Sequence, residues 1–268
     1  MDGSELSGVS RTTLWTLHNR ATEAARPRPL LEDPQAVRLL REIDYPYEET
    51  FGKPSQSHAL RALCFDRVVR RFRREWPQGT VVALGEGLQT GYWRLGDRRA
   101  PWVTVDLPEV VALRRRLLPE EGNLRQLALS ALDRSWQDEV EPGQGVLLSA
   151  EGLLMYFEPE QVYALLRDCA RRFPGGWMIF DSIPHWFSRR TLRGLRLTPG
   201  YTAPPMPFAL SVPEAARLPE RVPGLASATD LPLPPGRGPW RYAATLGGLP
   251  LLRGVRPSIT LVRFAHRS

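Results

Sequence analysis

The residues best suited to bind a ligand lie in a glycine-rich stretch, "LGEGLQTGYWRL" at 84–95, and at the end of the apolar run after it. Gly85 and Gly87 directly follow "TVVAL", and Asp106 comes about 20 residues later, where an acid accepts hydrogen bonds from ribose hydroxyls. Gly91 comes one place late for the G-x-G-x-x-G dinucleotide fingerprint. The pattern therefore predicts an adenosine-type cofactor without specifying NAD, and its alternative is a tight strand-to-helix turn.

Arg61 is a second candidate, because its position on a helix is unusual for a charged residue. With residues 60–76 helical, at about 100° per residue, Arg61 falls within an apolar stripe. The stripe consists of Leu60, Cys64, Phe65, Val68 and Phe72, whereas Arg67, Arg70, Arg71, Arg73 and Arg74 fall outside it and are expected to reach water. A buried guanidinium needs an anionic partner. Either a cofactor carboxylate or an acid of the chain would serve, and in the first case Arg61→Ala should cost the ligand-free protein little.

Composition restricts the class of protein. The 268 residues are 42% hydrophobic and 24% charged, which is typical of a globular chain. The polar start "MDGSELSGVS" is unlike a signal peptide, and no apolar run approaches the roughly 20 residues of a membrane helix. Cys64 and Cys169 lie in helical patterns among apolar neighbours, as free buried thiols do. We expect a cytoplasmic protein without a membrane partner, and we predict no metal site.

The net charge of +7 comes almost entirely from arginine, since Lys53 is the only lysine. The arginines form short groups within amphipathic helical patterns, including residues 114–116 and 171–172, which favours solvated helix faces. The sequence contains no nucleic-acid-binding motif, so no nucleic-acid partner is predicted. Binding through arginine remains an alternative that would show strongly salt-dependent affinity for DNA.

The order of predicted elements indicates an α/β fold. Two helices are expected within residues 10–42, the second capped by Asp33 with Pro34 in its first turn, and a long helix over 57–76. Short apolar runs then alternate with helices at 108–118 and 158–173. Seven strands are predicted, at 80–84, 102–107, 124–130, 145–152, 177–183, 225–231 and 258–266. Such alternation predicts a mostly parallel, Rossmann-like sheet with helices on both faces.

We expect one domain over residues 1–268, with a helical N-terminal cap at 1–78 and a core sheet formed by 79–184 and 224–268. The Pro- and Arg-rich segment 185–223 is a lid-like insertion before the sixth strand, in which Ser211 and Glu214 could cap a short helix. Oligomeric state is left open.

Three blocks, "VVALGEGLQTGYWRL", "VTVDLPEVVALRRRLLP" and "SAEGLLMYFEPEQVYALLRDCARRFPGGWMIFDSIP", resemble the PPM1/leucine carboxyl methyltransferase and tetracenomycin-type O-methyltransferase superfamily. The N-terminal "GVSRTTLWTLHNRATEA" and "EDPQAVRLL" match its bacterial branch, so the resemblance covers roughly residues 8–184. It implies the seven-stranded methyltransferase fold and S-adenosylmethionine (SAM) as cofactor. It also implies a set of cofactor-binding residues: Arg61, Gly85, Gly87, Asp106, Leu107, Ser130, Ala131 and Glu151.

The chain departs from the pattern of its relatives at three positions. Where relatives commonly read GLDTR, this chain reads "GLQTG", so Gln89 replaces an acid and Gly91 an arginine. Ser130 stands where relatives often carry Asp, and its hydroxyl can still accept a hydrogen bond. A SAM-binding relative that has lost turnover is therefore an alternative to an enzyme.

Methyl transfer to a carboxylate needs no base, whereas a phenol, with a pKa near about 10, gains from one. His185 after the fifth strand and Tyr156 in "LLMYF" are the candidate catalytic residues, with a surface imidazole and a packing tyrosine as their alternatives. Aromatic residues of the insertion suit an aromatic or polyketide-like small-molecule acceptor. The sequence thus predicts a SAM-dependent O-methyltransferase, and the glycine spacing disfavours a nicotinamide oxidoreductase.

Overall fold

The computed structural model describes residue 3, residues 8–97 and residues 100–266. The helices are α1 (Thr12–Ala24), α2 (Pro34–Glu42), α3 (Tyr47–Phe51), α4 (Ser57–Glu75), α5 (Gly91–Leu95), α6 (Pro108–Leu117), α7 (Pro159–Arg172), α8 (His185–Leu192), α9 (Val212–Ala216), α10 (Leu218–Arg221) and α11 (Ala243–Gly247). The strands are β1 (Thr80–Leu84), β2 (Trp102–Asp106), β3 (Leu124–Ala128), β4 (Val146–Ala150), β5 (Trp177–Ser182), β6 (Arg196–Thr198), β7 (Tyr201–Thr202), β8 (Leu225–Asp230) and β9 (Ser258–Phe264).

Seven strands form one sheet in the order β3-β2-β1-β4-β5-β9-β8, which confirms the predicted fold class. The five strands from β1 to β5 are parallel, and β9 runs antiparallel to both β5 and β8. Strand β1 has β2 as its neighbour on one side and β4 on the other, so the strand order reverses direction at β1. Ligands of open α/β sheets bind outside the carboxyl ends of the strands at such a reversal, and the glycine-rich loop lies there.

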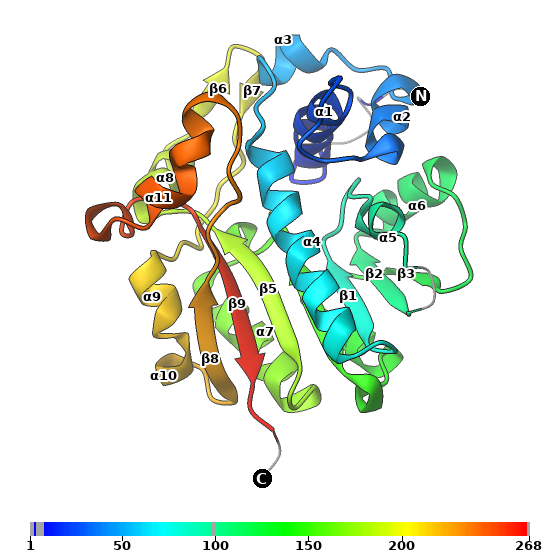
Figure 1. Ribbon diagram of the computed structural model, residues 1–268, viewed down its shortest axis with the longest axis vertical. Coiled ribbons are helices and arrows are strands. Elements are labelled where there is room, and N and C mark those ends of the chain that lie inside the picture. The colour runs from blue at the N-terminus through cyan, green and yellow to red at the C-terminus, as the bar shows by residue number, and fades with distance from the viewer. Residues whose placement is uncertain (1–2, 4–7, 98–99, 267–268) are drawn as a thin grey trace.

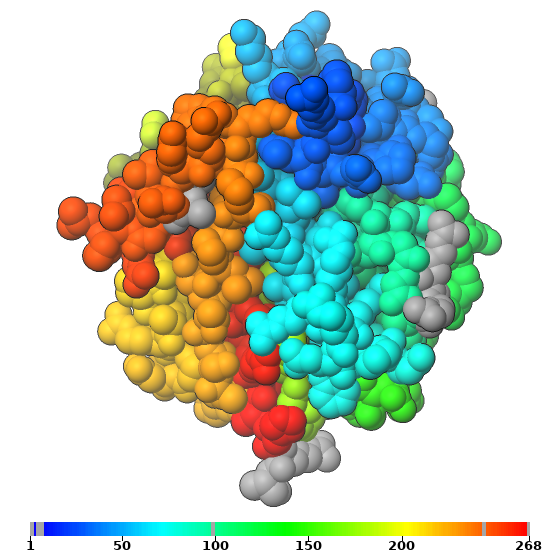
Figure 2. Space-filling view, viewed as in Figure 1, coloured from blue at the N-terminus to red at the C-terminus, as the bar shows by residue number. Residues whose placement is uncertain are grey.

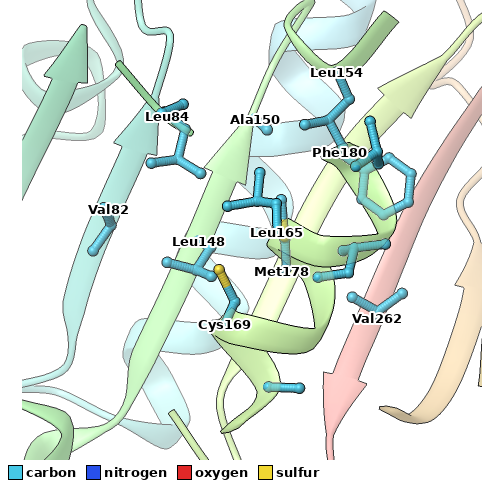
Figure 3. Close-up of a cluster of buried hydrophobic side chains, with 14 of the residues drawn as sticks. Val82, Leu84, Leu148, Ala150, Leu154, Leu165, Cys169, Met178, Phe180 and Val262 are labelled. Atoms are coloured by element: carbon cyan, nitrogen blue, oxygen red, sulfur yellow. The ribbon is translucent and has the colours of Figure 1, made fainter. Parts of the chain in front are cut away.

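Both faces of the sheet are covered, so the central strands are buried along their whole length. In β4, Leu147 packs with residues of α4, whereas Leu148 and Ala150 pack on the opposite face with residues of α7. Figure 3 shows the second of these clusters, with Cys169 of α7 over the sheet. Side chains alternate between the faces of a strand, which makes this two-sided burial possible. Both cysteines are free and buried, as predicted.

The N-terminal helices lie beyond the carboxyl ends of the parallel strands (Figure 1). Asp33 caps α2 as predicted, accepting the backbone N–H of Ala36 at 3.0 Å, and Pro34 occupies the first turn. The same carboxylate accepts from Arg94 of α5 at 2.8 Å, and Arg94 also binds Asp66 of α4 at 2.8 Å. This buried ion network fixes the cap to α4 and to the helix that follows the glycine-rich loop.

Two long connections follow β5, one before β8 and one between β8 and β9. The first holds α8, the β6–β7 hairpin, α9 and α10, and Ser211 with Glu214 forms the predicted capping box at α9. The second consists of residues 231–257 between β8 and β9. The sequence prediction includes these residues in the core-sheet span 224–268 and does not set them apart as a segment of their own. In Figure 2 this segment extends as an orange band to the blue N-terminal helices. Arg237 in this segment pairs with Glu23 of α1, and its N–H donates to Gln56 at 2.7 Å.

Two arginines expected on solvated faces are buried, so those predictions are wrong. Arg73 of α4 is 8% exposed and donates to the Asp97 carbonyl at 2.7 Å. Arg114 of α6 is 0% exposed and contacts the glycine-rich loop. Helical periodicity marks which side of a helix is apolar, but it cannot reveal that a neighbouring loop supplies acceptors to a guanidinium on the other side. No helix among the described residues is long and apolar enough to cross a membrane.

We expect the ion network of Arg94, Asp33 and Asp66 to stabilise the folded protein. Arg94→Leu leaves Asp33 and Asp66 buried without their strongest partner, so we expect unfolding free energy to fall by about 3–5 kcal/mol. The matched control is Arg171→Ala on α7, whose pair with Asp168 is exposed and should contribute no more than about 1 kcal/mol. Urea denaturation of both variants checks this; equal losses would contradict the assigned role of the network.

Candidate functional site

The loop after β1 requires glycine at two positions. Gly85 has φ +58° and Gly87 has φ +55°, both in the left-handed region. A Cβ at Gly85 would lie 2.6 Å from the side chain of Leu153, and one at Gly87 would overlap the Thr13 hydroxyl. Neither position can therefore carry a side chain without moving its neighbour, and the backbone stays open toward the cavity beside it.

Two fully buried arginines hold the carbonyl groups of this loop. Arg20 of α1 donates to the Leu88 carbonyl at 2.9 Å, and Arg114 donates to the carbonyls of Gly87 at 2.6 Å and Gln89 at 2.9 Å. Arg114 is also 3.0 Å from the carboxylate of Glu86, to which the Thr104 hydroxyl donates. Neither of these loop-binding roles is predictable from the sequence pattern. A guanidinium that binds loop carbonyls leaves no signal in apolar periodicity.

Asp106 at the end of β2 closes the loop from the other side. One of its oxygens accepts the N–H of Gly87 at 2.6 Å, and the other accepts the N–H of Leu107 at 2.8 Å. Burial raises the pKa of the Asp106 carboxyl above its usual value, although the two N–H donors act in the opposite direction. Each carboxylate oxygen has a second lone pair, so Asp106 can still accept from a ligand.

A cavity of about 230 Å³ lies beside the loop, and the residues predicted to bind a cofactor all line it. They come from the ends of four strands and from α4: Arg61, Gly85, Gly87, Asp106, Leu107, Ser130, Ala131 and Glu151. Parallel strands present their carboxyl ends at one edge of a sheet, which explains how positions far apart in sequence meet. We call this the loop cavity.

Arg61 is paired within the chain. Its Nε lies 3.0 Å from Glu151 and its Nη1 lies 2.9 Å from Asp181 at the end of β5. Burial opposes the charge on Arg61, but the two carboxylates raise its pKa overall. The expectation that Arg61→Ala would cost the ligand-free protein little is therefore wrong, because two buried carboxylates depend on this arginine. Asp181 was missed, although an acid ending a strand was the signal already used for Asp106.

The altered "GLQTG" loop is accommodated locally. Gln89 donates from its amide nitrogen to Glu151 at 2.7 Å, while its carbonyl oxygen has no hydrogen-bond partner among the described residues. The Nη2 atom of Arg61 likewise has none. Gly91 begins α5. A Cβ added at Gly91 would lie 3.7 Å from the guanidinium of Arg94. The side chain of Arg94 thus supplies a positive charge close to position 91.

A second cavity, of about 460 Å³, adjoins the first and is mostly apolar. The two share Thr12, Thr16, Arg61, Gly152 and Tyr156, which mark the junction between them. We call this larger space the apolar cavity. Its remaining wall includes Trp15, Met155, Ile183, Phe187, Met206, Leu231, Leu233, Trp240, Leu252 and Val255. Segment 231–257 contributes much of this wall, whereas the predicted lid 185–223 contributes Phe187 and Met206.

The two candidate catalytic residues have different positions. Tyr156 lies at the junction, where burial raises the pKa of its hydroxyl while a hydrogen bond with Thr12 partly opposes that shift. His185 is absent from the lining of both cavities; its Nε2 binds Glu214 at 2.7 Å, and its side chain is 48% exposed. The structure therefore brings Tyr156, but not His185, to the cavities.

His58 lines the apolar cavity, although the sequence pattern does not mark it as a site residue. Its Nδ1 lies 2.6 Å from the amide nitrogen of Asn19 in α1. The other end of that amide, its oxygen, accepts the backbone N–H of Ser55 at 2.6 Å. The Ser55 N–H can only donate, so it fixes the orientation of the Asn19 amide. His58 lies about one helical turn before Arg61 on α4. The apolar periodicity of the helix did not mark it as a candidate.

The pairing of Arg61 leads to a testable expectation. Arg61→Ala should lower the unfolding free energy of the ligand-free protein by about 3–5 kcal/mol, because Glu151 and Asp181 lose their shared cation. Burial raises the pKa of Glu151 and Arg61 lowers it, so in the variant this pKa rises further in the folded state, and the variant should recover stability as pH is lowered toward about pH 5. Denaturation at several pH values measures this. Arg67→Ala, on the exposed side of α4, is the control and should change stability by less than about 0.5 kcal/mol; an Arg61→Ala variant as stable as the control would contradict the pairing.

The comparisons with known proteins agree with this geometry. Residues 13–170 match the model of the family described as leucine carboxyl methyltransferase. The tetracenomycin polyketide synthesis O-methyltransferase TcmP of Streptomyces glaucescens is 33% identical over 98% of this chain and 96% of its own. The SAM-dependent methyltransferase dpfgK of Gibberella zeae is 30% identical over 63% of this chain and 62% of its own.

A solved structure supports the fold alone. A protein of Thermobifida fusca assigned as a methyltransferase superposes with a TM-score of 0.54 at 16% identity, covering 94% of each chain. The match to the family model extends over more than half of the chain, from α1 to α7, and therefore includes both the glycine-rich loop and the block around Tyr156. The chain belongs to the leucine carboxyl methyltransferase family and is a SAM-dependent methyltransferase.

Proposed function

We propose that this enzyme transfers a methyl group from SAM to an oxygen atom of a small aromatic molecule, preferably an oxygen that arrives ionised, as in a carboxylate. The observation that carries this proposal is the pair of adjoining cavities, of which the loop cavity suits the cofactor and the apolar cavity suits the acceptor. One family and one relative support oxygen as the acceptor atom: the matched family is named for carboxyl methylation, and TcmP is named an O-methyltransferase.

The loop cavity fits the polar ends of SAM. Asp106 would accept from the ribose hydroxyls, and Ser130 and Ala131 would lie near the adenine. The amino-acid end carries a carboxylate and an ammonium group. Arg61 Nη2, a donor, and Gln89 Oε1, an acceptor, have no hydrogen-bond partners among the described residues. The donor would suit the carboxylate, and the acceptor would suit the ammonium group. In this proposal Gln89 takes over the ammonium contact that an acid would otherwise make.

SAM supplies an activated methyl group on a sulfonium. A lone pair of the acceptor oxygen forms the new bond to carbon, the carbon–sulfur bond breaks, and its electron pair stays on sulfur. A neutral hydroxyl would also have to lose a proton. Among the described residues of the apolar cavity, Asp181 is engaged with Arg61 and with the N–H of Gly152, and the pKa of Tyr156 is raised. The scarcity of an available base favours an acceptor that needs none.

The chain itself contributes alignment and exclusion of water. Tyr156, Thr12 and Thr16 line both cavities, so they would surround the point where the acceptor oxygen meets the methyl group. Trp15, Phe187 and Trp240 offer flat apolar surfaces to a ring system. Segments 185–223 and 231–257 would together cover the acceptor. The proposed setting remains the cytoplasm, and the proposed partner is a small molecule rather than a nucleic acid.

Cofactor specificity is the first expectation of this proposal. S-adenosylhomocysteine should bind and raise the melting temperature, by linkage to the folded state, whereas NAD should do neither. Calorimetry and thermal denaturation with each ligand test this. Stabilisation by NAD and none by the SAM analogues would overturn it. A protein that binds S-adenosylhomocysteine but methylates no aromatic acid or phenol offered with SAM would instead support the alternative of a SAM-binding relative without turnover.

Asp106 gives a sharper test of the loop cavity. Asp106→Ala should weaken S-adenosylhomocysteine binding by roughly 1.5–3 kcal/mol, about tenfold to a hundredfold, because a charge-assisted hydrogen bond to the ribose is lost. The variant also frees the N–H groups of Gly87 and Leu107, so its ligand-free melting temperature is measured alongside. Ser227→Ala on β8, which lies outside the lining of both cavities, is the control for affinity. Unchanged affinity in Asp106→Ala would reduce Asp106 to a loop-closing residue.

A further inference from the structure

His58 has a defined protonation pattern in the ligand-free chain. Asn19 presents its amide nitrogen to Nδ1 of His58, because its oxygen is already committed to the N–H of Ser55. An amide nitrogen donates, so Nδ1 must accept and the ring proton of the neutral imidazole resides on Nε2. Asn19 is only 2% exposed, so water does not compete for this arrangement.

The imidazole is also held neutral by its surroundings. Burial lowers the pKa of His58 well below its usual value, and the positive charges of Arg61 and Arg20 lower it further. Trp15 packs its ring edge-on against the imidazole, with centroids 5.3 Å apart. A neutral ring whose Nε2 already carries the proton cannot act as a base through that atom. It can donate one directed hydrogen bond.

Among the described residues that line the apolar cavity, few other donors have comparable strength. Arg256 lines it, but its guanidinium nitrogens are directed to the Gly247 carbonyl at 2.8 Å, the Pro257 carbonyl at 2.8 Å and the carboxylate of Asp230. The other cation among the described lining residues, Arg61, pairs through Nε and Nη1 with Glu151 and Asp181, and its Nη2 is the donor proposed above for the cofactor carboxylate. His58 lies three residues before Arg61 on α4, and residues at this spacing share one face of a helix. Its ring is thus near the junction, where the proposed function puts the acceptor oxygen.

Resting on the proposed methyltransferase function, we propose that His58 orients the acceptor by donating its Nε2–H to an oxygen of an aromatic carboxylate. Asn19 is the positioning residue that holds the ring in the tautomer able to do so. In a carboxylate, one oxygen can accept this hydrogen bond while the other attacks the methyl carbon. The contact selects a substrate with an acceptor oxygen next to its nucleophilic oxygen, a requirement that the apolar walls alone cannot impose.

The tautomer can be tested without any acceptor. Nitrogen-15 NMR of histidine-labelled protein at neutral pH should show His58 with its proton on Nε2. Asn19→Asp replaces the amide donor by a carboxylate, which can only accept, so Nδ1 of His58 should become protonated in that variant. A wild-type His58 protonated on Nδ1, or an unchanged ring in Asn19→Asp, would overturn the assignment.

Acceptor binding is tested with 2-naphthoate titrated into protein saturated with S-adenosylhomocysteine. The ligand should shift the Nε2 resonance of His58, and His58→Phe should weaken its binding about tenfold, the loss of one hydrogen bond to a charged group. His58→Gln, whose amide nitrogen reaches the place of Nε2, should retain most of the affinity, whereas His58→Asn should not. His185→Gln, outside both cavities, is the control.

The two proposals fail in different ways. All His58 variants should bind S-adenosylhomocysteine as the wild type does; a wild type that does not bind it would refute the proposed function at its first step. If S-adenosylhomocysteine binds but 2-naphthoate does not, or binds without shifting His58 and equally well to His58→Phe, the role assigned to His58 is wrong while cofactor binding stands.

Discussion

Buried positive charge around the glycine-rich loop is the constraint on which the rest of this structure depends. Arg20 and Arg114 bind the carbonyl groups of residues 87–89, and Arg61 binds two acids at the ends of β4 and β5. A buried guanidinium is costly unless anions or hydrogen-bond acceptors offset the loss of its hydration. The loop, the cap and the strand ends must therefore meet correctly for any of these charges to be accommodated.

This arrangement couples the N-terminal helices to the ligand site. Arg20 comes from α1 and Asp33 precedes α2, so the cap is joined to the loop by charge as well as by apolar packing. The same helix α1 places Asn19 against His58 and contributes Thr12 and Thr16 to the junction of the cavities. One helix thereby fixes the loop conformation, borders the cofactor space and sets the polarity of the acceptor space.

The departures from the GLDTR pattern are local exchanges of partners within this charged framework. Gln89 remains hydrogen-bonded to Glu151, and the guanidinium of Arg94 lies close to the position vacated at Gly91. No uncompensated charge results, because an acid and an arginine are absent together. The framework tolerates these changes because its net charge near the loop is preserved. One atom of Arg61, Nη2, and one of Gln89, Oε1, have no hydrogen-bond partner among the described residues, and both residues line the loop cavity.

The sequence by itself determined the sheet and the chemistry at its edge. Strand and helix alternation predicted seven strands, and the glycines with Asp106 predicted a nucleotide-type ligand. Both signals are local, because each depends only on residue types and their spacing along the chain. Only the tertiary structure decided the partners of Arg61, the burial of Arg73 and Arg114, and which histidine lines the apolar cavity. These depend on which polar groups from distant segments meet in a buried place, and neither periodicity nor spacing along the chain records such encounters. The wall formed by residues 231–257 was missed for the same reason, because a loop acquires its position from the surfaces it packs against.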